Sequence, residues 1–226
     1  MRLIWRSLLW LVCASIVAGL TVLIGIRVER HVLRRHAEAL MADMQSITLR
    51  ETTFQQVQPI FRRWRRWGKF IRPCSPARCE FDIRLHDLDS RPDRYLYRDH
   101  AVFQLASLVG ESPTAISARI GVLNGVVSSE QIGFAIETPG HLLSAQTASS
   151  PRIDLPRGAH STPAPNYAVW SPPNFPDMVR LEFTPSADPS RIHRLMAIDF
   201  SCLTRWRPCQ SRDQIMPAAM SAAAAP

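Results

Sequence analysis

The stretch SLLWLVCASIVAGLTVLIGI, residues 7–26, decides how this chain is organised. It contains no charged residue, it is rich in Leu, Ile and Val, and it lies between Arg6 and Arg27. A helix of about 20 residues is about 30 Å long, which is the thickness of the hydrocarbon core of a bilayer. We therefore predict one N-terminal transmembrane helix that contacts the lipid bilayer through residues 7–26 and stays there as a signal anchor.

A cleaved signal peptide is the alternative interpretation of this stretch. The apolar run is longer than the apolar region of most signal peptides, and no A-x-A-like cleavage site precedes Arg27. Basic residues flank both ends of the run, and long domains cross the membrane largely regardless of such charges. The orientation of the chain must therefore be predicted from another feature.

The cysteines supply that feature. Cys13 lies in the apolar run, and the other four form two close pairs, Cys74/Cys79 and Cys202/Cys209. Paired cysteines beyond an anchor are typical of disulfides in an oxidising compartment, and local pairing of such short loops stabilises a fold by roughly 2–2.5 kcal/mol each. A four-thiolate zinc site is the alternative, but the C-x4-C and C-x6-C spacings differ from the common C-x2-C knuckle. We predict two local disulfides and a C-terminal domain outside the cytoplasmic membrane.

Length and composition leave room for one domain beyond the anchor. The chain has 226 residues, of which 46% are hydrophobic and 20% charged, and this excludes a fully disordered protein. The formal net charge is +8, and Lys69 is the one lysine among the 27 basic residues. The predicted organisation is an anchor over 1–26, a juxtamembrane helical stalk over 27–48, an α+β domain over 49–217 with a Pro-rich mobile insertion over 139–177, and a disordered Ala-rich tail over 218–226.

Helical periodicity continues after the anchor. Apolar residues recur at helical spacing over residues 27–45, which predicts either a stalk that packs on the domain or a short dimerising coiled coil. A second helix is expected to begin at Thr53, because Thr53 and Gln56 form a T-x-x-Q capping box and Gly68 suits the C-terminal end. A third is expected over 99–109. A fourth is expected to begin at Asp188-Pro189 and to continue to Trp206.

Alternating patterns predict the strands. Residues 79–86 and 179–183 alternate between apolar and polar side chains, and a hairpin over 116–137 is centred on Asn124-Gly125. A two-residue turn there would place Ile132, Phe134 and Ile136 on the solvent side. A three-residue loop with a bulge at Gly125 returns them to the core, and we predict that loop; a two-residue turn with a bulge further down the second strand is the alternative. The predicted fold class is α+β, an antiparallel sheet of about four strands backed by helices.

One segment combines basic and aromatic residues. The segment is FRRWRRWGKF, residues 61–70. On a helix, one arc carries Phe54, Val57, Ile60, Phe61 and Trp64, and the opposite arc carries Arg62, Arg63 and Arg66. Such a pattern is typical of an amphipathic helix with an apolar core side and a wet charged side. The alternative is an anionic surface, such as lipid headgroups or an acidic polymer, bound by these basic residues. The candidates for that contact are Arg62, Arg63, Arg65, Arg66 and Lys69.

No motif of catalysis or cofactor binding is present in the sequence. It contains no H-E-x-x-H, P-loop, G-x-S-x-G or dinucleotide fingerprint, and its seven histidines are scattered. We predict no catalytic residue, no metal site and no cofactor. Nucleic acid is not an expected partner in the predicted compartment.

The order of these parts resembles an uncharacterised family of single-anchor bacterial envelope proteins. The similarity is carried by the anchor, the Arg-rich stalk, the LRETTF stretch at 49–54, the PCSPARCEF stretch at 73–81, and CLT at 202–204 with the Pro208-Cys209 pair. It implies the architecture and assigns no activity. The functional expectation is a membrane-anchored extracytoplasmic module that binds an envelope protein partner or organises the envelope, without enzymatic activity. The alternatives are an envelope hydrolase with a site assembled from distant residues, and an anionic membrane-surface binder.

Overall fold

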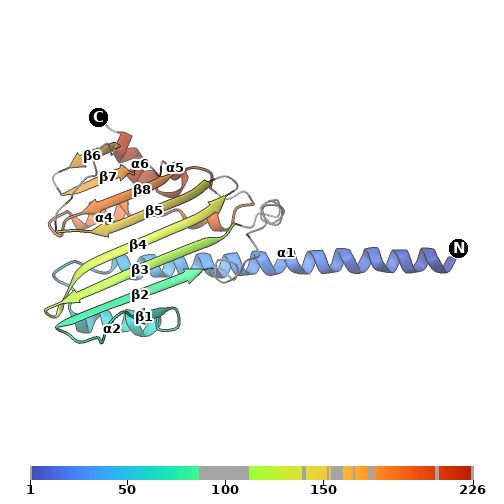
Figure 1. Cartoon of the computed structure of the whole chain (residues 1–226), viewed down its shortest axis with the longest axis horizontal. Helices are drawn as coiled ribbons and strands as arrows, with labels where there is room; N and C mark the ends of the chain where they lie inside the picture. Colours follow the sequence, from blue (N-terminus) through green and yellow to red (C-terminus); the bar gives the residue numbers. More distant parts are fainter. Residues whose placement is uncertain are drawn as a thin grey trace.

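A computed structural model of the chain describes residues 2–86, 112–138, 141–151, 153, 160–164, 166–172, 175, 177–206 and 209–224. The fold is α+β, as predicted, with one long apolar N-terminal helix and one sheet (Figure 1). The helix predicted over 99–109 lies outside the described residues.

The sheet is larger than predicted and it is mixed. Eight strands lie in the order β1-β2-β3-β4-β5-β8-β7-β6, where about four antiparallel strands were expected. All neighbouring pairs are antiparallel except β5 and β8, which run parallel. The strands are β1 (Gly68–Phe70), β2 (Arg78–His86), β3 (Thr114–Leu123), β4 (Val126–Thr138), β5 (His141–Ser149), β6 (His160–Ala164), β7 (Tyr167–Ser171) and β8 (Met178–Phe183).

Helix α1 (Arg2–Gln45) is one uninterrupted helix with two different halves. Its N-terminal half projects away from the sheet, is exposed, and is long and apolar enough to cross a membrane (Figure 1). Its C-terminal half packs on the sheet through a stripe of buried residues at helical spacing: Leu33, Ala37, Leu40, Met41 and Met44. The stalk therefore packs on the domain of its own chain, and the residues between Arg27 and Gln45 include no Gly or Pro.

Helix α2 (Phe54–Arg63) begins as the sequence predicts. The Thr53 hydroxyl accepts a hydrogen bond from the Gln56 amide, and the Gln56 side chain accepts one from the Thr53 amide, which completes the capping box. The helix tolerates Pro59 and ends earlier than Gly68, because Trp64 caps it and Gly68 already belongs to β1. Val57, Ile60 and Phe61 are buried against the sheet.

The β3–β4 hairpin corrects the predicted turn. Leu123 pairs with Val126, and Asn124 and Gly125 have φ values of 53° and 84°, so the turn has two residues and not three. The register shifts between Gly121 and Val122, because Val122 faces Val127 while Gly121 faces Ser129. Ser128 is therefore the extra residue of a bulge. That bulge returns Ile132, Phe134 and Ile136 to the core side of the sheet. The longer loop was predicted because it would have the same effect.

Two segments predicted to lack structure contain elements of the fold. The Pro-rich insertion over 139–177 contains β5, β6 and β7, so that prediction is wrong for its described residues. The Ala-rich tail contains α6 (Pro217–Ala224), in which Ala219 is buried, so the prediction of a disordered tail is also wrong there. Both segments are rich in prolines and small residues, so they contain few large apolar side chains at regular spacing from which an element could be predicted. Small side chains nevertheless allow a helix or a strand to pack closely.

The long helix predicted from Asp188 to Trp206 is two short helices. Asp188 caps α4 (Pro189–Leu195), as expected, but the chain leaves the helix at Met196. Asp199 then caps a 3-10 helix, η2 (Phe200–Leu203), through a hydrogen bond of 2.9 Å from the Ser201 amide to its carboxylate. A second cap inside a helical pattern ends the first helix, because the Asp side chain takes over backbone donors. Helix α5 (Arg212–Ile215) precedes α6.

The two faces of the sheet differ. Figure 1 shows α1, α2 and α4 behind the sheet, while the face toward the viewer carries no helix among the described residues. The inner face, toward the helices, is formed by buried apolar side chains such as Phe81, Ile120, Phe134 and Leu181. The residues of the outer face follow from the period of two along each strand. This face carries charged, polar and small residues together with the exposed Leu123 and Leu142.

Candidate functional site

Both predicted disulfides are present. Cys74 and Cys79 are bonded with Cα atoms 4.4 Å apart, and Cys202 and Cys209 with Cα atoms 5.1 Å apart. The local pairing is therefore confirmed. All four sulfur atoms are engaged in these two disulfides, so the alternative of a four-thiolate zinc site is wrong for these cysteines.

The basic and aromatic segment divides between core and solvent. Trp64 is buried, and its indole N–H donates to the Asp43 carboxylate of α1 at 2.8 Å. Trp67 packs between Trp64 and His36, with ring centroids 5.6 and 4.7 Å away. The two tryptophans of this segment therefore belong to the contact with α1 and are not free to enter a lipid surface beside the arginines.

The five candidate basic residues are exposed: Arg62 and Arg63 end α2, Arg65 and Arg66 lie in the turn after it, and Lys69 lies in β1. Two of them have intramolecular partners: Arg63 forms an ion pair with Asp43 at 2.6 Å, and the Arg66 guanidinium lies 5.6 Å from the Trp67 ring. Asp43 is sixteen residues after Arg27 on α1, about 24 Å along the helix axis. That distance exceeds the Debye length of about 8 Å, so these charges lie far from the end of the apolar run.

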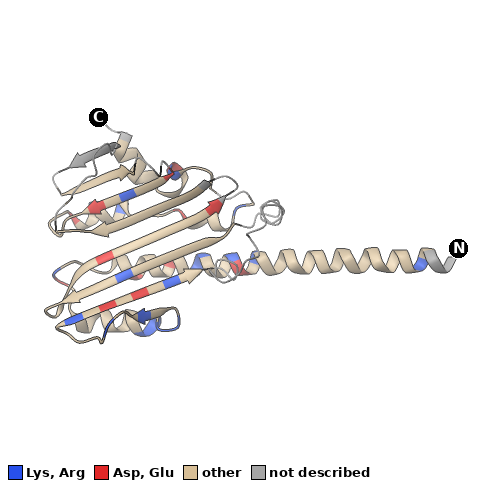
Figure 2. Cartoon of the chain, viewed as in Figure 1, with Lys and Arg blue, Asp and Glu red and all other residues tan. Residues whose placement is uncertain are grey.

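Basic and acidic residues lie close to one another along β2 and β3 (Figure 2), and several of them form ion pairs on the outer face of the sheet. Asp82 of β2 is almost fully buried and lies 2.8 Å from Arg84 and 3.6 Å from Arg119. Arg119 of β3 also lies 3.6 Å from Glu80. Lys69 of β1 is the register neighbour of Asp82 on the other side. This ladder is close to neutral and leaves little charge for a ligand.

A surface pocket of about 530 Å³ opens beside this ladder. It lies where β2 begins and β3 ends, next to the Cys74–Cys79 disulfide. Its lining consists of Arg72, Pro73, Arg78, Cys79, Glu80, Gly121, Val122, Leu123, Ser128 and Ser129. The guanidinium groups of Arg72 and Arg78 make no hydrogen bond or ion pair with any described residue, in contrast to the arginines of the ladder.

The hydroxyl of Ser129 in this pocket depends on a glycine. Gly121 is the register partner of Ser129, and a Cβ at Gly121 would lie 2.2 Å from the Ser129 Oγ. The neighbouring Ser128 hydroxyl donates to the Gly121 carbonyl at 3.3 Å, whereas the Ser129 hydroxyl has no partner among the described residues. Among the described residues, the pocket thus combines two guanidinium groups and one hydroxyl without partners, while its one carboxylate, Glu80, faces Arg119 at 3.6 Å. The two guanidinium groups and the hydroxyl are suited to an anionic oxygen-rich group.

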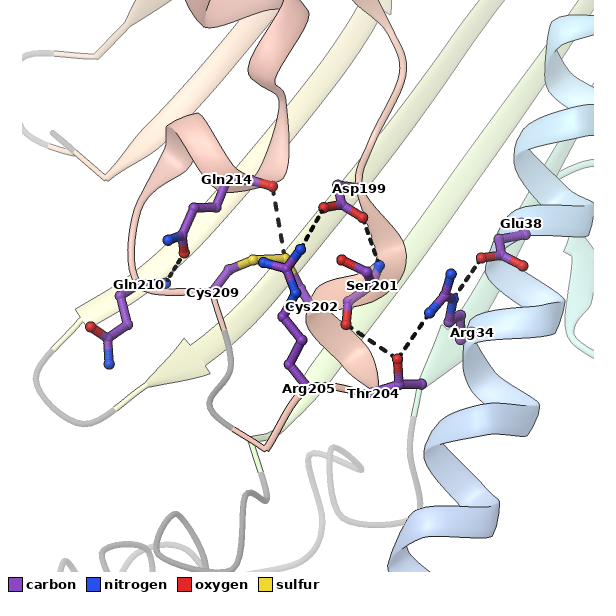
Figure 3. A network of polar contacts seen from close by, with 10 residues as sticks. All are labelled: Arg34, Glu38, Asp199, Ser201, Cys202, Thr204, Arg205, Cys209, Gln210 and Gln214. Carbon is purple, nitrogen blue, oxygen red and sulfur yellow. Dashed lines mark hydrogen bonds and ion pairs between the residues drawn. A yellow bond between two sulfur atoms is a disulfide. The ribbon is translucent and has the colours of Figure 1, made fainter.

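The opposite end of the domain carries a second disulfide loop, and its arginines are engaged. Arg34 of α1 pairs with Glu38 at 2.6 Å and donates to the Thr204 hydroxyl at 3.0 Å (Figure 3). Arg205 lies 3.3 Å from the Asp199 carboxylate. This network holds the Cys202–Cys209 loop against α1.

Asp199 has a lowered pKa for an identifiable reason. Partial burial acts to raise the pKa of its carboxyl group, but hydrogen bonds from Ser201 and the charges of Arg205 and Arg34 outweigh that effect. The carboxylate therefore stays ionised and acts as the cap of η2.

Glu130 of β4 is an acid on the inner face. It is the register partner of Ile120, it is buried, and its Oε2 has no hydrogen-bond partner among the described residues. Burial raises the pKa of Glu130 to about 8. A neutral carboxylic acid at this position is compatible with a general acid, but Glu130 is not among the residues that line the pocket beside the Cys74–Cys79 disulfide. The described histidines are spread over the fold, with His31 and His36 on α1, His86 on β2 and His193 on α4.

The disulfides were predicted from the sequence, whereas the pocket was not. Arg72 and Arg78 were not singled out, because their lack of partners depends on which carboxylates the strands bring near. The only local signal was their position on either side of Cys74, with Arg78 directly before Cys79.

Comparison of the chain with protein-family models, with curated proteins and with solved structures gave no match. Function must therefore be argued from the geometry of the chain itself.

Proposed function

We propose that this chain is a single-pass protein of the bacterial cytoplasmic membrane, with an extracytoplasmic domain that binds an anionic group of an envelope partner. The binding site is the pocket lined by Arg72, Arg78 and Ser129. The single observation that carries this proposal is the contrast in arginine partners. Arg72 and Arg78 have no partner among the described residues, while Arg84 and Arg119 beside them are paired.

The pocket is also at the end of the domain that an envelope partner would meet first. The β3–β4 turn contacts the chain just after α1, through a hydrogen bond of 2.8 Å from the Phe54 amide to the Gly125 carbonyl. Figure 1 places this turn at the end of the sheet away from the N-terminus. A domain anchored through residues 7–26 would therefore present the pocket away from its own membrane.

A binding experiment tests the pocket. The full chain in detergent is titrated with inorganic phosphate and with oligogalacturonate, which carry the two common anionic groups of envelope polymers. The R72A/R78A variant is expected to weaken binding at least tenfold, because both charges that face the ligand are removed. Stability should change little, since neither guanidinium group makes a hydrogen bond or ion pair with a described residue.

The matched control removes the same charge from α2. The R62A/R65A variant should bind as the wild type does if the pocket is the site. Loss of binding in R62A/R65A, with binding retained in R72A/R78A, would instead assign the anionic surface to the Arg/Trp helix. Capture from solubilised membranes with the two variants as baits then identifies the partner that depends on the pocket.

A second experiment tests the compartment. The proposal predicts that alkaline phosphatase fused after residue 226 is active, and that a green fluorescent protein fused there is dark. Bright fluorescence would place the domain in the cytosol. Mass mapping without reductant is expected to recover the Cys74–Cys79 and Cys202–Cys209 peptides as linked pairs.

A further inference from the structure

The domain begins to cover α1 before the apolar run ends. Residues 8–22 of α1 are exposed, but Leu23, Ile26 and Arg27 are half-buried and Arg30 is buried. These four positions are spaced by three, one and three residues and therefore share one side of the helix. The domain thus reaches down to the level at which the apolar run meets its first flanking charge.

The part of the domain at that level is the turn after η2. The Arg27 guanidinium donates to the Thr204 carbonyl at 3.0 Å and lies 4.5 Å from the centre of the Trp206 ring. Trp206 is nevertheless 57% exposed. One face of its ring lies on the Arg27 cation, and the rest of the side chain is exposed. The apolar ring and the polar N–H group suit a boundary between an apolar and an aqueous environment.

This turn is held rigidly against α1. The Cys202–Cys209 disulfide closes the loop, and the Thr204 hydroxyl accepts a hydrogen bond from Arg34, about two turns beyond Arg27 on α1 (Figure 3). Arg205 is tied to Asp199 in the same loop. The position of Trp206 along the helix axis is therefore fixed relative to Arg27.

The spacing of exposed tryptophans along α1 matches a bilayer. Trp5 and Trp10 are 72% and 76% exposed near the N-terminus. Arg27, the level of Trp206, is about 33 Å along the axis from Trp5 and about 26 Å from Trp10. The hydrocarbon core is about 30 Å thick, and tryptophan is enriched at both of its boundaries.

We propose that the Thr204–Trp206 turn lies in the lipid headgroup layer and that Trp206 is an interfacial anchor of the folded domain. The partner of this surface is the lipid of the bilayer that α1 crosses, so the inference rests on the proposed membrane anchor. Arg27 and Trp206 together form a second attachment point beside α1. It sets the depth and tilt of the domain on the membrane.

Lipid quenching of tryptophan fluorescence tests the inference. The full chain is reconstituted in vesicles of lipids brominated either near the headgroup or deep in the acyl chains. In the W5F/W10F background, shallow bromines are expected to quench part of the emission, and W206F in that background should abolish this lipid-dependent part. W170F is the matched control, because Trp170 is buried in β7, and it should leave the quenching unchanged.

The outcomes separate the two proposals. If the wild type loses no emission to either lipid and does not float with vesicles, the membrane anchor itself is wrong, and the inference fails with it. If the wild type floats and Trp5 or Trp10 is quenched, while W206F changes nothing in the W5F/W10F background, only the interfacial role of Trp206 is wrong. Stronger quenching of Trp206 by deep than by shallow bromines would also overturn it.

Discussion

Two carboxyl groups on opposite faces of the same sheet are about equally buried and are treated very differently. Asp82 on the outer face is 4% exposed and lies within 4 Å of two guanidinium groups. Glu130 on the inner face is 5% exposed, and no cation partner of its side chain is found among the described residues. The comparison indicates that Asp82 on the outer face is stabilised in its charged form by the two guanidinium groups. Glu130 on the inner face is accommodated in its neutral form.

The largest expected effect concerns Glu130. A carboxyl with a folded pKa of about 8 and an ordinary value of 4.5 binds its proton more tightly in the folded state. Below pH 4.5 it leaves the free energy of unfolding unchanged, and between pH 4.5 and 8 stability falls as the unfolded state alone ionises. At pH 7 this costs up to about 3 kcal/mol.

Glu130→Gln is therefore expected to raise the free energy of unfolding at pH 7 and to flatten its decline between pH 5 and 8. Urea unfolding of the full chain in detergent at pH 5, 7 and 9 measures both. Glu137→Gln, on the exposed outer side of the same strand, is the control and should change neither. An unchanged pH profile in Glu130→Gln would mean that Glu130 has a partner on the inner face.

A glycine on each face gives the next comparison. A Cβ at Gly68 would lie 2.3 Å from Cζ of the buried Phe81 ring, whereas one at Gly133 would lie 2.8 Å from the Ser117 hydroxyl. A ring packed in the core cannot move aside, but an exposed hydroxyl can rotate. Gly68→Ala is therefore expected to cost about 1–3 kcal/mol and Gly133→Ala less than about 1 kcal/mol. Equal unfolding midpoints for the two variants would contradict the difference in packing between the faces.

The smallest expected effect is on the outer face. Asp82→Asn removes the carboxylate that Arg84 and Arg119 share and should cost about 1 kcal/mol, because both arginines are largely exposed. The loss should shrink in high salt, which screens the ion pairs of the wild type. Unfolding midpoints at 0.05 and 1 M salt measure this. A loss as large as that of Gly68→Ala, and insensitive to salt, would show that Asp82 acts through packing.

The parts of the fold that depend on local chemistry were predictable from the sequence. The capping box at Thr53, the cap at Asp188 and the two cysteine pairs need only neighbouring residues. The core positions of Ile132, Phe134 and Ile136 were also predicted, although they result from a bulge after a two-residue turn and not from the predicted three-residue loop. A bulge at Ser128 and a longer loop solve the same parity problem, and the sequence does not distinguish the two.

The parts that depend on distant contacts were not predictable. Strand β5 alternates Leu143, Ala145 and Thr147 on its inner side, which is a weak apolar pattern that becomes a strand because β4 and β8 flank it. The pocket likewise requires the Cys74–Cys79 loop to meet Gly121 of β3. Its unpaired arginines were hidden in a sequence that contains many others.

The uninterrupted course of α1 has a mechanical consequence. With neither glycine nor proline between Arg27 and Gln45, the helix provides no swivel between the apolar half and the domain. The domain of a protein anchored this way could rotate about the bilayer normal but not bow toward the lipid. As the domain rotates, the proposed binding pocket would stay at a constant distance from the bilayer, which is set by the about 27 Å of helix between Arg27 and Gln45. A partner could bind the pocket only at that distance from the membrane surface.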